Sequence, residues 1–172
     1  MKHVFSVLSV TCVAFFTIFL STTNVSCKKG DTGPKGDTGV ANMIYSAWQD
    51  VSYTRQVPQP GDTIWSASIS APKLTKDVID KGEIKVYINF GTPTSPDISP
   101  IPYFDGGVII NPDFEVGSIN LISNVNAGTT TSAGNKYFQY RYILITGSVP
   151  ARKDASYWNN YQQVAKDLGI KD

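Results

Sequence analysis

Apolar and polar residues alternate with period two along much of this chain, and that period is typical of half-buried β-strands. In one such segment Trp65, Ala67 and Ile69 interleave with serines. Residues 138–145 are largely apolar or aromatic in both phases of the alternation, which predicts a central strand buried on both faces. The sequence predicts strands at 65–69, 84–90, 108–110, 119–122 and 138–145.

Turn-forming residues separate these segments. The sequence Gln-Pro-Gly-Asp at 59–62 precedes the first predicted strand. Residues 91–102 contain four prolines, which predicts a long loop. Residues 127–135 form a cluster rich in Gly, Thr and Ser that suits a wide hairpin.

Two helices are expected beside the strands. Thr75 is a suitable N-cap for a short mid-chain helix that ends at Gly82. In the tail, Asp154 is a suitable N-cap for a helix over 154–168, and Gly169 supplies its end. The fold class is therefore predicted to be mainly β: an antiparallel β-sandwich-like domain with a short mid-chain helix and a C-terminal helix.

Residues 1–26 read as a secretory signal rather than as part of the fold. Lys2 and His3 give a short basic start, and residues 4–20 are apolar with scattered hydroxyl groups. A membrane span is the alternative. The apolar run is short for about 30 Å of hydrocarbon, so cleavage is the favoured interpretation.

Cys27, directly after this segment, is the predicted site of lipid attachment. The two residues before it fit a lipobox, the motif that directs a diacylglyceryl group onto a cysteine thiol, although Asn24 stands where leucine is usual. The other cysteine, Cys12, would be removed with the signal, which leaves Cys27 without a disulfide partner in its own chain. Ordinary cleavage near Thr23, leaving a free thiol, is the alternative.

Glycine recurs at every third position after this cysteine, as in the collagen triple helix, where only Gly fits at the crowded axis. The repeat comprises Gly30, Gly33, Gly36 and Gly39. Three such triplets span only roughly 30 Å, so residues 27–40 are expected to be a lipid anchor and a semi-extended tether. A trimer nucleus, helped by high local concentration on a membrane, is the alternative and is not favoured.

The run from Cys27 to Gly39, followed at once by Ala-Asn-Met-Ile-Tyr-Ser-Ala-Trp at 41–48, resembles a set of collagen-like lipoproteins found in Bacteroidota. Further matching segments are 74–82, 86–87, 140–145, 161–166 and 168–170. The resemblance covers most of the mature chain and implies one exported, β-sandwich-like domain over 41–172. It implies no catalytic residues.

The composition removes most common active-site chemistry. The only histidine is His3, in the predicted signal, so the mature chain has no histidine base, nucleophile partner or zinc ligand. Acylation of Cys27 would remove thiolate chemistry as well. The sequence contains no phosphate-binding glycine loop. The remaining acids lie in or beside predicted turns, where Asp is common for local reasons. We therefore expect no enzymatic activity and no cofactor.

The charge balance speaks against nucleic acid as a partner. The chain has 15 basic and 14 acidic side chains, and Lys2 would leave with the signal. A mature chain with balanced charge lacks the basic surface that binds phosphates.

Two small groups of residues are candidates for binding. Asn111, Asp113 and Glu115 alternate, so they would share one face of an extended segment and could offer oxygen ligands to calcium. A polar turn is the favoured interpretation of that group. Tyr103 and Phe104, in the proline-rich loop, are the candidate exposed aromatics for ligand contact.

Two functions are consistent with these features. The first is a lipid-anchored, non-enzymatic structural or accessory protein of the cell envelope that docks onto another envelope protein, with the outer membrane as the expected location. The second is a glycan-binding or other ligand-binding module that uses loop aromatics. A large exposed apolar patch would favour docking, and a groove lined by parallel rings would favour glycan binding.

Overall fold

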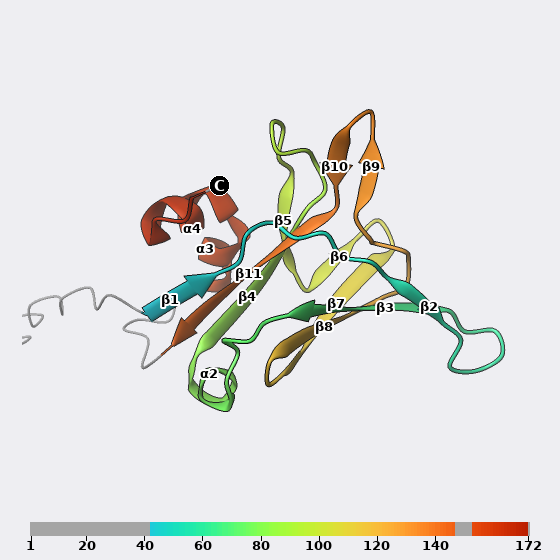
Figure 1. Ribbon diagram of the computed structural model, residues 1–172, viewed down its shortest axis with the longest axis horizontal. Coiled ribbons are helices and arrows are strands. Elements are labelled where there is room, and N and C mark those ends of the chain that lie inside the picture. The colour runs from blue at the N-terminus through green and yellow to red at the C-terminus, as the bar shows by residue number, and fades with distance from the viewer. Residues whose placement is uncertain (1–41, 147–152, 172) are drawn as a thin grey trace, which may run out of the picture. The chain divides into compact units, whose positions relative to one another are not determined.

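The computed structural model describes residues 42–146 and 153–171, and all of the elements below belong to one unit of the chain. The predicted signal, the predicted lipid-attachment site Cys27 and the glycine repeat lie outside these residues. Two antiparallel sheets face each other in the described part, and two helices lie on the far side of one of them (Figure 1).

The four-stranded sheet has the order β1-β11-β4-β5. Its strands are β1 (Asn42–Tyr45), β4 (Glu83–Asn89), β5 (Ile98–Ile101) and β11 (Gln139–Thr146). The five-stranded sheet has the order β2-β3-β8-β7-β6. Its strands are β2 (Thr54–Gln56), β3 (Ile64–Ser70), β6 (Tyr103–Asp105), β7 (Val108–Glu115) and β8 (Ser118–Ser123).

The main core lies between the two sheets, as period-two alternation predicts. Ile69 and Leu121 point inward from the five-stranded sheet, and Val86, Ile88 and Leu144 point inward from the four-stranded sheet. Each of these side chains is at most 2% exposed. A β-sandwich-like arrangement, predicted from the alternation, is therefore confirmed.

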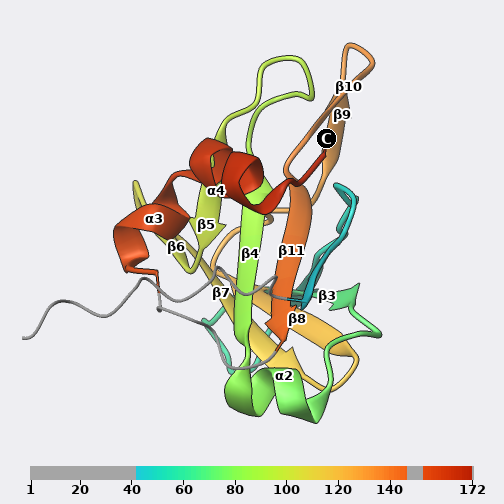
Figure 2. The same ribbon diagram turned by 90° about the vertical axis from the view of Figure 1, so that its left-hand side faces the viewer.

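Helix α2 (Lys76–Lys81) lies at one end of the sandwich. The Thr75 side chain accepts a hydrogen bond from the Val78 backbone N–H, and Gly82 ends the helix, as the sequence predicts. Val78 is buried in the core. The hairpin of β9 (Thr130–Ser132) and β10 (Asn135–Tyr137) projects from the opposite end (Figures 1 and 2).

The second face of the four-stranded sheet is covered by α3 (Ala155–Asn159) and α4 (Tyr161–Leu168), as Figure 2 shows. Tyr87 and Ile143 point from the sheet into a second cluster with Trp158, Tyr161 and Val164 of the helices. Because this sheet is packed on both faces, β11 is buried along nearly its whole length, as predicted for a central strand. No helix in the described part of the chain is long and apolar enough to cross a membrane.

The prediction of one continuous helix over 154–168 is wrong, because the helix breaks at Asn160. The backbone of Asn160 is not helical (φ −103°, ψ 84°). Its N–H donates to the Tyr157 carbonyl, and its side chain accepts a hydrogen bond from the Gln163 N–H, so one residue ends α3 and begins α4. Asp154 and Gly169 do form the two outer ends as predicted.

Two predicted connections also differ from the structure. The proline-rich segment 91–102 contains a strand, β5, which is tolerated because Pro100 lies on an edge strand. The hairpin within 127–135 is narrow rather than wide, since Ala133 and Gly134 alone connect its strands, both with positive φ. β7 likewise runs beyond the predicted 108–110. β6 begins at Tyr103, opposite Ile110, so the side of β7 beyond Ile110 is free of a neighbouring strand and tolerates Pro112.

Candidate functional site

The two sheets differ in what covers their outward sides. Helices α3 and α4 cover the four-stranded sheet, whereas polar side chains occupy the outward side of the five-stranded sheet, here called the outer face. By strand alternation the outer face comprises Thr54, Gln56, Ile64, Ser66, Ser68, Ser70, Phe104, Ile109, Asn111, Asp113, Glu115, Ser118, Asn120 and Ile122, most of which are polar. Their inward neighbours, such as Ala67 and Leu121, pack in the core.

A hollow of about 530 Å³ lies on the outer face. Its volume is within the range of sites that bind small molecules. It is lined by Ser52, Thr54, Gln56, Ser66, Ala67, Ser68, Asp113, Asn120, Leu121 and Ile122. Most of these side chains are neutral and carry hydroxyl or amide groups, so the hollow presents many hydrogen-bonding groups and little charge.

The strand register places these side chains next to one another. Ser66 of β3 lies opposite Ile122 of β8. Two residues further along, Ser68 lies opposite Asn120, and Asn120 lies opposite Asp113 of β7. Side chains directly opposite in antiparallel strands are about 5 Å apart, so Ser68, Asn120 and Asp113 form one polar row across three strands.

The polar groups of this row are available to a ligand. Among the described residues, no side-chain hydrogen bond occupies the Asn120 amide or the Asp113 carboxylate, whereas Gln56 Nε2 donates to Ser66 Oγ over 3.4 Å. Asp113 is the single ionisable side chain among the described residues that line the hollow. The hollow can therefore both donate and accept hydrogen bonds, with one negative charge at its edge.

Tyr103 and Phe104 lie in strand β6 and not in a loop, so the sequence-based location is wrong. Because they are adjacent in a strand, their side chains point to opposite faces. Tyr103 is half-buried and packs on Phe90, with ring centroids 4.8 Å apart. Phe104 is 77% exposed on the outer face. The two rings therefore do not form a joint platform.

Asn111, Asp113 and Glu115 share the outer face of β7, as their alternation predicts, and all three are exposed. The favoured interpretation of this group as a polar turn is therefore wrong, because pairing of β7 with β8 keeps the segment extended. Side chains two residues apart in a strand are separated by about 6.6 Å, too far for all three to approach one ion. Within residues 42–146 and 153–171 no group of three or more His, Cys, Asp and Glu side chains could hold a metal.

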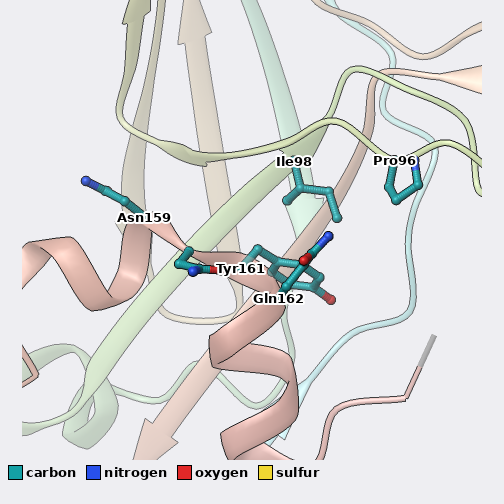
Figure 3. A pocket seen from close by; sticks show the side chains of 6 residues that line it. Pro96, Ile98, Asn159, Tyr161 and Gln162 are labelled. Atoms are coloured by element: carbon teal, nitrogen blue, oxygen red, sulfur yellow. The ribbon is translucent and has the colours of Figure 1, made fainter.

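A second, smaller crevice lies where α3 meets α4 (Figure 3). Its volume is about 350 Å³, and it is lined by Pro96, Ile98, Asn159, Asn160, Tyr161 and Gln162. Figure 3 shows Pro96 and Ile98 on the segment above it and Asn159, Tyr161 and Gln162 on the helices below. The side chain of Asn160 is already used to cap α4, and the Tyr161 hydroxyl accepts a hydrogen bond from Arg141. This crevice therefore offers fewer available polar groups than the hollow.

Most other aromatic side chains serve packing. Trp65 packs against the main core, and Tyr140 and Tyr142 are buried in it, as the sequence predicts. The Tyr140 hydroxyl donates to the Ala127 carbonyl (2.7 Å) and lies 3.2 Å from the Tyr53 hydroxyl. Burial raises the pKa of Tyr53 to about 12 and also raises the pKa of Tyr140, so both phenols are neutral at physiological pH.

The polar row of the hollow was not predicted from the sequence. The signal was visible in part, because serines alternate with apolar residues in 65–69 and Asn120 interrupts an apolar run. What places Asn120 beside Asp113 is the strand order, which alternation does not determine. No family model matches this chain, and no solved structure matches it at a significant level.

Proposed function

We propose that this chain is a lipid-anchored, non-enzymatic accessory protein of the cell envelope that binds a neutral glycan on the outer face of its five-stranded sheet. The observation that carries the glycan assignment is the hollow of about 530 Å³ with its neutral hydroxyl and amide lining. Sugars present many hydroxyl groups that both donate and accept, and such a lining complements them.

The anchor part of the proposal rests on the sequence. Cys27 follows an apolar leader and precedes the short Gly-x-y run, which fits a lipid anchor with a tether. The expected location is the outer membrane. Acyl chains contribute about 0.8 kcal/mol for each buried CH₂, so two or three chains would hold the protein firmly on a membrane.

Docking of a protein partner through a broad apolar surface is the less favoured role. The exposed large apolar side chains of the described residues are Val57, Phe104, Val116, Ile122 and Val125. Val57 follows β2, Val116 lies in the β7–β8 turn, and Phe104 lies on edge strand β6. Phe104 and Ile122 share the outer face with Ile109, whereas the three valines lie outside the strands. An apolar group of three side chains is small beside a protein interface, which takes about 20 residues on each side.

The glycan assignment is tested with the full lipidated protein in nanodiscs, free of glycoside detergents. The probes are cellohexaose, mannohexaose, xylohexaose and maltohexaose, with binding measured by calorimetry. We expect at least one to bind and Asn120→Ala to weaken that binding about tenfold, because a hydrogen bond to a sugar hydroxyl is lost. Asn159→Ala, the same change in the crevice beside α3, is the control and should leave binding unchanged.

Each outcome decides between sites. Failure of all four hexasaccharides to bind would overturn the glycan assignment and return the weight to a protein partner. If Asn159→Ala abolishes glycan binding and Asn120→Ala leaves it unchanged, the site is the crevice and not the hollow.

The anchor has its own test. Cys27→Ser should release the protein from membranes, and unchanged partitioning into detergent would contradict lipidation.

A further inference from the structure

We propose that the glycan site extends beyond the hollow to a second subsite at Phe104, so that the ligand is a linear chain of several sugars rather than one sugar or two. This inference rests on the proposed function and specifies its substrate. Phe104 and the hollow lie on the same outer face, and the strand register connects them.

The connection runs diagonally across three strands. Phe104 of β6 lies opposite Ile109 of β7. Two residues further along β7 is Asn111, which lies opposite Ile122 of β8, and Ile122 lines the hollow. Two strand spacings of about 4.8 Å and one two-residue step of about 6.7 Å place the Phe104 position roughly 12 Å from Ile122. One sugar ring cannot reach both.

Phe104 is unusual for its exposure. A phenylalanine that is 77% exposed on a regular strand leaves most of its apolar ring in water, even though its cross-strand neighbour Ile109 is also apolar. An exposed aromatic ring presents a flat apolar surface with a negative face, which suits the C–H face of a pyranose. The ring therefore complements a sugar in a way that hydrogen-bonding groups do not.

The strand fixes the direction in which Phe104 leaves the backbone. Its neighbour Tyr103 is fixed on the inward side against Phe90, so alternation directs Phe104 outward. The β6–β7 turn is closed by Asn124, whose Oδ1 accepts from the Ile109 N–H (2.8 Å) and whose Nδ2 donates to the Gly107 carbonyl (2.7 Å). This support fixes the backbone that carries Phe104, so a ligand has only the side-chain rotamer of Phe104 left to order.

Charge selects among glycans. The hollow carries one ionisable side chain, Asp113, among the described residues that line it, and Glu115 lies two residues further along the same face. These carboxylates oppose anionic polysaccharides and leave neutral ones unaffected. The expected ligand is therefore a neutral, linear oligosaccharide long enough to span from Asn120 to Phe104.

The test compares chain lengths on the full lipidated protein in nanodiscs. The disaccharide and the hexasaccharide of the linkage that binds, for example cellobiose and cellohexaose, are titrated by calorimetry. We expect the hexasaccharide to bind about tenfold more tightly, and Phe104→Ala to remove that advantage while leaving disaccharide affinity unchanged. Phe104→Trp should retain the advantage. Val116→Ala, at another exposed apolar residue, is the control.

The possible failures are distinguishable. If no sugar binds, the proposed function falls and this inference falls with it. If Asn120→Ala weakens both sugars but Phe104→Ala weakens neither, the hollow binds glycan and the second subsite is wrong. If Phe104→Ala weakens both sugars equally, Phe104 acts on the hollow itself, and the claim of a separate subsite is overturned.

Discussion

The guanidinium carbon of Arg141 lies 4.7 Å from the ring centroid of Trp48, and the Arg141 side chain is 2% exposed. The same guanidinium lies 5.7 Å from the Tyr45 ring and donates to the Tyr161 hydroxyl of α4. A desolvated cation over aromatic faces is stabilised by about 2 kcal/mol. Arg141 therefore joins the first described strand, the central strand and the C-terminal helices at one point.

Replacing Arg141 tests this junction. We expect Arg141→Ala to lower the free energy of unfolding by about 3 kcal/mol, because it removes the contacts and leaves a cavity under α4. Arg141→Met keeps most of the volume and removes the buried charge, so its cost should be nearer 1 kcal/mol. Urea unfolding measures both. The control is Arg55→Met on exposed β2, which should stay within about 0.5 kcal/mol. An Arg141→Ala cost that small would contradict the junction.

Stability should fall in alkali because of the buried tyrosine pair. The pKa of Tyr53 is about 12 in the folded chain against 10.0 for a free tyrosine, because burial disfavours the phenolate. Below pH 10 the phenol is protonated in both the folded and the unfolded chain, so its burial contributes fully to the free energy of unfolding. As the pH rises from about 10 to about 12, the unfolded chain loses the proton first, so on the order of 2 kcal/mol is lost.

Denaturant unfolding at a series of pH values measures this loss. Tyr53→Phe should make the dependence shallower, while the raised pKa of Tyr140 keeps part of it. A free energy of unfolding that stays level from pH 10 to pH 12 in the parent protein would contradict the burial of the pair.

The β9–β10 turn should accept a stabilising substitution. Ala133 has φ +49°, a conformation that costs an L-residue with a Cβ about 1 kcal/mol, and Gly134 follows with φ +79°. Two-residue turns of this kind favour Asn-Gly. We expect Ala133→Asn to raise the free energy of unfolding by about 0.5 kcal/mol, measured by urea unfolding. The same change at Ala155, inside α3, should not stabilise, and equal effects at both positions would contradict the turn assignment.

Gly82 should tolerate no side chain. A Cβ at this position would lie 2.5 Å from the Ile145 carbonyl oxygen and 2.7 Å from that of Val78. Both are backbone atoms, so Gly82→Ala should cost about 2–3 kcal/mol by forcing α2 away from β11. Gly61→Ala meets no atom within 4 Å and is strained only by its positive φ of +97°, so about 1 kcal/mol is expected there. Equal losses of unfolding free energy in Gly82→Ala and Gly61→Ala would contradict the close approach of Gly82 to the carbonyl oxygens of Ile145 and Val78.

The fold could be predicted where a residue acts on its own neighbours. Thr75 caps α2 and Asp154 caps α3 because a capping side chain reaches only the next turn of the same helix. The alternation of Trp65, Ala67 and Ile69 determined the inward face of β3 because the period of a strand is fixed by its backbone. These signals are local, and the sequence contains them in full.

The candidate site could not be predicted because it depends on pairs. Asn120 lies beside Asp113 only because β8 pairs with β7. Phe104 lies on the same face only because β6 pairs with the other edge of β7. Alternation assigns a side chain to one of two faces but does not say which strands are neighbours. The proline-rich segment shows the same limit, since β5 exists through its pairing with β4 and its own residues favour a loop.

The place of β1 in the four-stranded sheet has a mechanical consequence. β1 is a four-residue edge strand, hydrogen-bonded to β11 alone in its sheet, and it is the first element of the described chain. Any tension applied to the chain ahead of Asn42 enters the domain through this one ladder. The load then passes to β11, which Arg141 joins to Trp48 and α4. The resistance of the domain to pulling from this end is thus set by a four-residue edge strand and by the buried arginine behind it.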